Sequence, residues 1–428
     1  MLILLVTLGV FLAPPVEPLL APLPDAPVRV TGWADARRRL IARSTDLERA
    51  AAAVSHADAQ WRLALAALLP DAQGSLAVTE DLHDEPVPGS TATDPLWTGR
   101  IGVSVPIVDV AAWKGKSAAA AGQRGARAEL AEARRDLDQQ LADTLIAVGA
   151  AERIATLNRD GLRLAIDRLV LGEKAFSLGA ATELDVVRIR QDVAVARSAL
   201  VAGDEQARRA REALGLALGE EGEVGVAPGV EIASLPDGIR QVCRPLDQGE
   251  ARSDLTAALA RVDAARRRRG QARAAYLPTI SLAGDYVAWT TDPGGFDTRT
   301  WTVSAVLSLP IFDGGRRGAA IVDAGASLRE ATAVAEDTRR GVRLDVARAR
   351  RGLAVARDLV AAATEARDLA LRLDEMTRRS FTIGRATSVD VVQSASTLRL
   401  AELTLAQRLF ELERARVVAL LVEARCDG

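Results

Sequence analysis

The stretch FSLGAATELDVV, residues 176–187, decides the fold of this chain because it occurs a second time as FTIGRATSVDVV, residues 381–392. Phe, Gly, Thr, Asp and the two closing Val residues recur at an offset of 205. Further pairs recur at similar offsets: LLPDAQGSLAV at 68–78 with YLPTISLAGDY at 276–286, VSVPIVD at 103–109 with LSLPIFD at 307–313, and Trp97 with Trp301. Nearly constant offsets indicate a unit of about 200 residues copied in tandem.

The composition favours long, closely packed helices. Of the 428 residues, 49% are hydrophobic and 26% are charged, but only 3% are aromatic. Low aromatic content with abundant alanine and arginine is typical of such helices. The formal net charge of −2 gives no reason to expect a nucleic-acid partner.

The N-terminus has the character of a secretory signal. Residues 1–13 are apolar except for Thr7, and two prolines follow them. Such a segment is too short to span a bilayer as a helix. The sequence therefore predicts four parts, namely a signal-like segment at 1–30, a first repeat at 31–219, a connector at 220–249 and a second repeat at 250–428.

Two predicted helices are unusually long. They cover residues 114–175 and 316–380, and each would extend for about 100 Å. Shorter helices are predicted at 33–68, 183–218, 250–275 and 388–424. Two short helices placed end to end match one long helix, which indicates an antiparallel helical cylinder. Apolar residues spaced seven apart indicate coiled-coil packing, as at Val186, Val193, Leu200, Ala207 and Leu214.

Each repeat also contains a predicted hairpin of strands, with the four strands at about 70–82, 97–107, 278–290 and 300–311. The second strand of each hairpin alternates apolar and polar residues, which gives the strand one apolar face. About 9 to 11 residues suffice to cross a bilayer at a tilt, but a strand in lipid must belong to a closed barrel. Four strands cannot close one, so several chains would have to share it. Trp97, Trp289 and Trp301 would suit an interfacial aromatic belt. A small soluble sheet covered by helices is the alternative.

In the order and spacing of these motifs, the chain resembles the TolC-like outer-membrane efflux proteins over residues 33–424. The paired turns, AAYLPTISLAGDY and LSLPIFDGGRR carry the resemblance. It implies a mainly helical homotrimer, with twelve strands in one transmembrane barrel and a long helical barrel extending into the periplasm. It further implies passive export of small molecules across the outer membrane, with a periplasmic adaptor and an RND or ABC-type inner-membrane pump as partners.

Under this resemblance the repeated turn is the periplasmic tip. Local physics already predicts that Thr182 and Thr387 cap the helices that follow, and that Gly179 and Gly384 end the helices that precede. In each turn an aspartate lies three residues after the threonine, near the positive end of the helix dipole. Helix capping and the turn between helices explain every repeated residue. These local interactions neither require nor exclude a further role for either aspartate.

The resemblance assigns functional roles within the tip. It implies that Asp390 forms a carboxylate ring at the constriction and that Asp185 helps to lock the closed state. Phe176 and Phe381 begin the two turns, and Gln393 follows Asp390 by one helical turn. Two of these positions depart from the family pattern, because Phe381 replaces a tyrosine and Gln393 replaces an aspartate. Since phenylalanine cannot donate a hydrogen bond, a strongly latched gate is not expected.

The remaining candidates are two cysteines and two histidines. In the family layout Cys243, in the connector, and Cys426, near the C-terminus, both belong to the equatorial region, and the periplasm is oxidising. A disulfide between them is therefore expected, with two free thiols as the alternative. His56 and His83 lack spaced metal-ligand partners, so no enzymatic activity, metal or cofactor is expected. A non-transporting coiled-coil scaffold of the cell envelope is the alternative function.

Overall fold

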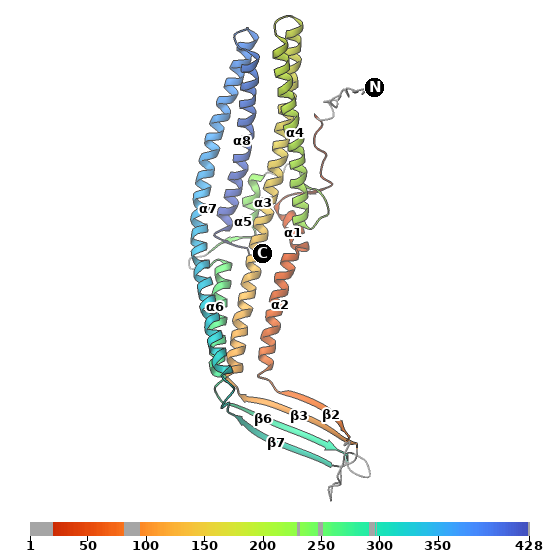
Figure 1. Ribbon diagram of the computed structural model, residues 1–428, viewed down its shortest axis with the longest axis vertical. Coiled ribbons are helices and arrows are strands. Elements are labelled where there is room, and N and C mark those ends of the chain that lie inside the picture. Colours follow the sequence, from red (N-terminus) through yellow and green to blue (C-terminus); the bar gives the residue numbers. More distant parts are fainter. Residues whose placement is uncertain are drawn as a thin grey trace, which may run out of the picture. The chain divides into compact units, whose positions relative to one another are not determined.

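The computed structural model describes residues 20–80, 95–228, 232–246, 251–290, 296 and 298–426 (Figure 1). The chain forms two compact units. The first contains residues 1–44, 135–245 and 345–428, and the second contains 45–134 and 246–344. Helices dominate both units, which confirms the predicted mainly helical fold with a small β part. No helix among the described residues is both long and apolar enough to cross a membrane.

Two helical hairpins build the first unit. Its helices are α1 (Trp33–Arg43), α4 (Glu183–Leu218), α5 (Leu235–Arg240), α8 (Ser388–Leu421) and the C-terminal parts of α3 (Val110–Ser177) and α7 (Arg316–Thr382). Leu162 and Ala165 of α3 pack against Val193, Ala196 and Leu200 of α4. The residues that the heptad pattern places at the α4 seam are buried, as predicted: Val186, Val193, Leu200, Ala207 and Leu214.

Short strands join the connector to both chain ends within this unit. Strand β1 (Val28–Val30) pairs in parallel with β4 (Val224–Val226), so the end of the signal-like segment 1–30 forms part of the fold. The 3-10 helix η2 (Ile232–Ser234) and α5 follow in the connector. Strand β5 (Arg244–Pro245) then pairs antiparallel with β8 (Ala424–Arg425), which ties the connector to the C-terminal segment.

The second unit carries the predicted sheet. It contains α2 (Thr45–Ala66), α6 (Ser253–Ala274), the N-terminal parts of α3 and α7, and the strands β2 (Asp71–Thr79), β3 (Leu96–Val108), β6 (Thr279–Trp289) and β7 (Thr298–Ser308). The strands lie in the order β2-β3-β6-β7, every pair antiparallel, as Figure 1 shows. Strands β2 and β7 form the two edges of this sheet. The predicted hairpin loops lie largely outside the described residues.

The two faces of the sheet differ in chemistry. Because opposed residues share a face, the register places one apolar set together, including Leu76, Val78, Trp97, Ile101, Val103, Leu282, Tyr286, Trp301, Val303 and Leu307. Several of these side chains are highly exposed, with Val303 at 85%. The opposite face carries mainly Ser and Thr. Trp289 pairs with Thr98 and Thr298 and thus lies on the polar face, so the prediction that it joins Trp97 and Trp301 in a lipid-facing belt is wrong.

Two predicted helix boundaries are also wrong. The helix expected at 33–68 is broken at Ser44, whose extended backbone (φ −70°, ψ 113°) ends α1 before α2 begins. The helix expected at 388–424 ends at Leu421 because Ala424 takes part in β8. At Ser44 the sequence itself carries a start signal for α2, because serine is a favoured N-cap residue and Asp46 and Glu48 follow in the first turn. At Ala424, strand pairing overrides a local sequence that is compatible with a helix.

Candidate functional site: the paired hairpin turns

The first turn connects α3 to α4 through residues with special backbone roles. Gly179 adopts a left-handed conformation (φ 74°), which glycine tolerates best. The Ala180 N–H donates to the carbonyl of Ala175 at 2.8 Å and so closes the end of α3. Thr182 and Asp185 then form a capping box, with the Asp185 N–H donating to Thr182 Oγ1 at 3.2 Å and the Thr182 N–H donating to Asp185 Oδ2 at 2.9 Å.

The second turn repeats this geometry between α7 and α8. Gly384 is left-handed (φ 72°), and the Arg385 N–H donates to the carbonyl of Ser380 at 2.8 Å. The Asp390 N–H donates to Thr387 Oγ1 at 3.3 Å, and the Thr387 N–H donates to Asp390 Oδ2 at 2.8 Å. The sequence repeat is therefore a repeat of helix-capping chemistry.

A side-chain hydrogen bond joins the two turns. The hydroxyl of Ser388, the first residue of α8, donates to Oδ1 of Asp185 in α4. Ser388 is only 3% exposed. This bond, followed by the side-chain and backbone hydrogen bonds from Thr182, lowers the pKa of Asp185 from 3.8 to about 2. The Ser388–Asp185 bond thus connects the α3/α4 hairpin to the α7/α8 hairpin.

The other predicted tip residues are not drawn into this contact. Asp390 and Gln393 are exposed on α8, Phe176 is 48% exposed, and Phe381 is half-buried. Backbone and side-chain hydrogen bonds from Thr387 lower the pKa of Asp390. Asp390 is therefore an ionised carboxylate at neutral pH with access to solvent, whereas Asp185 is engaged by the neighbouring hairpin.

Beyond the turns, a buried ion-pair network also joins the hairpins, and sequence reasoning did not find it. Asp192 of α4 is 5% exposed, and its carboxylate lies 2.8 Å from Nη2 of Arg168 in α3 and 3.5 Å from Nη1 of Arg399 in α8. The repeat gave no signal for this network, because Thr397 occupies the position equivalent to Asp192.

A second serine–aspartate bond stays inside one hairpin. The Ser394 hydroxyl of α8 donates to Oδ1 of Asp374 in α7 at 3.1 Å, and both residues are buried. Arg378 also lies 2.7 Å from the Asp374 carboxylate. The first unit therefore contains the same hydroxyl–carboxylate chemistry in two settings, between hairpins at Ser388 and within a hairpin at Ser394.

The two cysteines for which a disulfide was predicted lie together, Cys243 in the connector and Cys426 in the C-terminal segment. The sulfur atoms of Cys243 and Cys426 are 1.99 Å apart, and both residues are almost fully buried. Asp138 of α3 lies beside them, and its carboxylate is 2.7 Å from Nε of Arg37 in α1. Because the sulfur atoms are bonded to each other, they are not available as ligands for a metal ion beside Asp138. His56 is exposed, and His83 lies outside the described residues.

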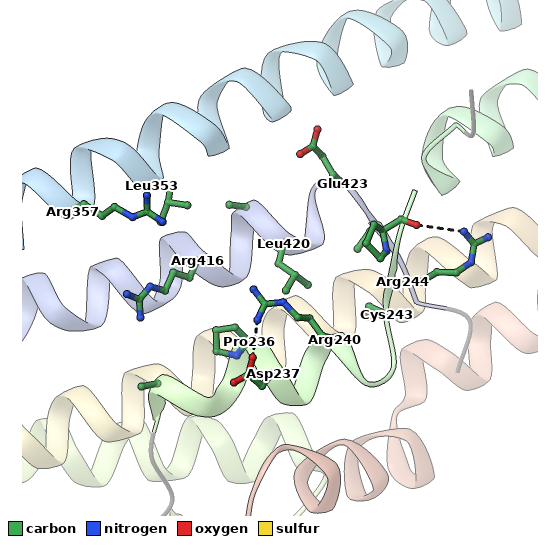
Figure 2. Close-up of a pocket in the computed structure, with 14 residues that line it drawn as sticks. Pro236, Asp237, Arg240, Cys243, Arg244, Leu353, Arg357, Arg416, Leu420 and Glu423 are labelled. Atoms are coloured by element: carbon green, nitrogen blue, oxygen red, sulfur yellow. Dashed lines mark hydrogen bonds and ion pairs between the residues drawn. The ribbon is translucent and has the colours of Figure 1, made fainter. Parts of the chain in front are cut away.

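A pocket opens next to this disulfide. Figure 2 shows residues of the connector, α7 and α8 around a cavity of about 710 Å³. Its lining includes Arg240, Arg244, Arg357 and Arg416 together with the carboxylates of Asp237 and Glu423. Asp237 pairs with Arg240 at 2.7 Å. The Cys243–Cys426 link therefore fixes two of the segments that shape this pocket.

Tandem helical hairpins, each joined to strands of a two-faced sheet, define a class of envelope channel proteins. The chain belongs to the outer membrane efflux protein family, because the sequence model of that family matches residues 36–220 and 249–419. This family consists of transport proteins rather than enzymes. Most of the matched residues lie in the helices and strands described above.

Individual relatives agree with this membership. The chain is 35% identical to outer membrane protein OprJ of Pseudomonas aeruginosa over 209 residues, which cover 45% of this chain and 43% of OprJ. It is 27% identical to the fusaric acid resistance protein FusA of Burkholderia cepacia over 311 residues, 67% of this chain and 57% of FusA. The alignments thus span less than two thirds of these relatives. The outer membrane protein VceC of Vibrio cholerae has the same fold, with a TM-score of 0.78, 18% identity, and coverage of 92% of this chain and 97% of VceC.

Proposed function

We propose that this protein is the outer-membrane channel of a tripartite export system, working as a homotrimer whose twelve strands close one barrel. The sheet is the observation that carries the proposal. It presents an apolar, exposed face opposite a mostly uncharged polar face, and the outer edges of β2 and β7 pair with no further strand among the described residues. Lipid permits strands only in closed barrels, and three copies of four strands satisfy this condition.

A matched pair of substitutions tests which face meets lipid. Val303 and Ser304 are neighbours in the middle of β7 and lie on opposite faces of the sheet. Arginine on a lipid-facing strand costs about 2–4 kcal/mol near the bilayer midplane, whereas a lumen-facing position tolerates it. Val303→Arg should therefore reduce the amount of assembled protein in outer-membrane fractions, and Ser304→Arg should leave that amount near wild type. Equal effects of the two substitutions would contradict the barrel.

The assembly itself is tested on the purified protein. A channel predicts extraction only with detergent, a trimeric mass, and conductance after insertion into planar bilayers. A monomer that stays soluble without detergent would favour the alternative, a coiled-coil scaffold of the cell envelope. These measurements use the full chain and need no knowledge of the cargo, which we propose to be small molecules such as drugs or metals.

The paired turns are proposed as the periplasmic tip of this channel. Asp390 and, one helical turn later, Gln393 would line the constriction, while Asp185 would hold the hairpins together through Ser388. The exposed, ionised carboxylate of Asp390 supports this division of roles. Asp390→Ala should weaken block of the conductance by divalent cations, and Gln393→Ala, which removes no charge, should weaken it much less. Unchanged block in Asp390→Ala would remove Asp390 from the pore.

The partners proposed are a periplasmic adaptor at the hairpin turns and an RND or ABC-type pump in the inner membrane. The exposed side chains of the turns support docking there, among them Phe176, Leu178, Ile383 and Arg385. Cross-linking from cysteines introduced at Leu178 and Ile383, followed by mass spectrometry, would identify the adaptor and, through it, the pump type. Cross-links confined to copies of this chain would contradict docking at the turns.

The Cys243–Cys426 disulfide also stays a prediction for the protein in the cell. Its expected role is to hold the C-terminal segment on the connector through the pair β5–β8. Thiol alkylation of the purified protein followed by intact-mass measurement decides the matter. We expect no label without reductant and two labels after reduction, and two labels without reductant would show free thiols.

A further inference from the structure

The polar face of the sheet contains few charges. Among its strand residues, uncharged side chains predominate, including Gln73, Ser75, Thr98, Ser104, Ser281, Thr300, Thr302 and Ser304. Asp71 stands at the start of β2. Away from the strand ends, the charged side chains on this face in the described strands are Arg100 of β3 and Asp285 of β6. Arg100 and Asp285 are thus a single pair of opposite charges in the middle of this face, and the nearest other charged strand residue on it is Asp71 at its end.

These two residues form an ion pair on the exposed surface of that face. Nη2 and Nε of Arg100 donate to Oδ1 of Asp285 at 2.6 and 2.9 Å. The Arg100 side chain is 58% exposed and that of Asp285 is 22% exposed. Both line a hollow of about 430 Å³, together with Gln73, Ser75, Ser104 and, at the start of β2, Asp71. Solutes that pass along this face therefore meet both charges.

Glycine at position 102 makes the pairing possible. Gly102 is directly opposite Asp285 in the register, and Arg100 is the diagonal neighbour. A Cβ atom at position 102 would lie 3.0 Å from Oδ1 of Asp285, inside the usual contact distance. The missing side chain lets the Asp285 carboxylate lie across β3 toward Arg100. The pair therefore depends on three positions of two adjacent strands.

The geometry points to mutual neutralisation of Arg100 and Asp285 as the feature that keeps the barrel from discriminating by charge, an inference that rests on the proposed trimeric channel. Three copies would place three Arg and three Asp in one ring around the lumen. Because each cation is cancelled by its adjacent anion, the intact ring exerts little net field on permeating ions. The wild-type barrel would consequently admit small cargo of either charge, and breaking the pair would impose selectivity.

Reversal potentials of reconstituted channels in a KCl gradient test this inference. Asp285→Asn leaves three unpaired arginines and should lower the permeability ratio of K⁺ to Cl⁻ by about threefold or more. Arg100→Gln leaves three unpaired carboxylates and should raise the ratio by a similar factor, and the double variant should return to the wild-type ratio. Arg299→Gln is the matched control, because Arg299 of β7 lies on the opposite, apolar face.

A chemical rescue keeps the test independent of how well each variant assembles. Arg100→Cys should shift selectivity toward cations, and modification of the new thiol with a cationic, water-soluble methanethiosulfonate should reverse the shift within the same channels. Unchanged ratios in both single variants, or no response of Arg100→Cys to the reagent, would overturn the inference. Absence of any conductance in the wild-type protein would instead contradict the proposed channel.

Discussion

Removing the hydroxyl of Ser388 is the most direct perturbation of the contact between the hairpins. In Ser388→Ala, Asp185 keeps its bonds within the capping box but loses the donor from α8. A hydrogen bond to a charged group contributes about 1.5–3 kcal/mol. Because the Asp185 carboxylate is partly exposed to water, we take the lower end of that range. About 1.5 kcal/mol corresponds to a roughly tenfold shift per chain toward separated hairpins.

Single-channel recording at neutral pH is the assay. We expect Ser388→Ala to raise the open probability or the conductance of the reconstituted channel by about an order of magnitude relative to wild type. Ser394→Ala is the matched control, since it removes an equivalent hydroxyl–carboxylate bond that lies within the α7/α8 hairpin. If both variants gate like wild type, the Ser388–Asp185 bond does not hold the tip closed.

The same bond has a defined pH dependence. The pKa of Asp185 is lowered from 3.8 to about 2 when the hairpins are joined, first by the Ser388 hydroxyl and then by the Thr182 bonds, and only the Ser388 contribution is lost when the hairpins separate. A lowered pKa in the joined state means that the stabilisation is complete above pH 3.8 and is lost as the pH falls toward 2. Wild-type channels should therefore open more readily between pH 4 and pH 2, and Ser388→Ala should show a smaller change over that range. Equal pH responses would refute the reasoning.

Three further predictions concern stability of the detergent-purified protein, the first two measured by thermal unfolding and the third by amide hydrogen exchange. Arg37→Met removes the guanidinium that lies 2.7 Å from the buried Asp138 carboxylate and should lower the free energy of unfolding by up to about 3–5 kcal/mol, most of which the additional change Asp138→Leu should recover; equal melting temperatures in wild type and Arg37→Met would contradict this. Cys243→Ser with Cys426→Ser opens a cross-link between residues 183 positions apart, worth up to ~5 kcal/mol on a chain-entropy estimate; a melting temperature unaffected by both the substitution and a reductant would exclude such a contribution. In Gly149→Val, a Cβ would lie 1.8 Å from Cδ1 of Ile232 in η2, so this side chain must be displaced from α3 and protection of the connector amides from hydrogen exchange should fall, whereas unchanged protection would contradict a role of this contact in holding the connector.

Features set by local sequence could be predicted well. The capping boxes depend on residues three positions apart, and α4 begins and ends where the sequence indicates because Thr182 caps its start and a left-handed Gly219 ends it. The strand β3 could be placed because its alternation is clean. The fold class followed from the repeat, which needs no knowledge of tertiary contacts.

Features that depend on distant contacts could not be predicted. The break at Ser44 is marked by neither glycine nor proline, and its one local signal is the serine itself as an N-cap residue of α2. Apolar and polar residues alternate less regularly in β6 than in β3, so the sequence did not indicate that Trp289 lies on the polar face. Ser388 could be recognised as a difference from Glu183 in the first repeat, but its bond to Asp185 joins residues 203 positions apart. The ion-pair network at Asp192 has no counterpart in the second repeat, so comparing the two repeats could not indicate it.

The Ser388–Asp185 bond has a consequence for how a duplicated chain can evolve. In an assembly of identical single repeats, every hairpin would carry the same residue at the position of Ser388, and all contacts around the ring would be chemically alike. Duplication released that constraint, so that one copy supplies a hydroxyl where the other carries Glu183. Contacts inside a chain and contacts between chains can then differ in strength. In the proposed trimer, a ring of six similar hairpins would thereby have two kinds of contact between neighbouring hairpins, and one kind could open while the other stays closed.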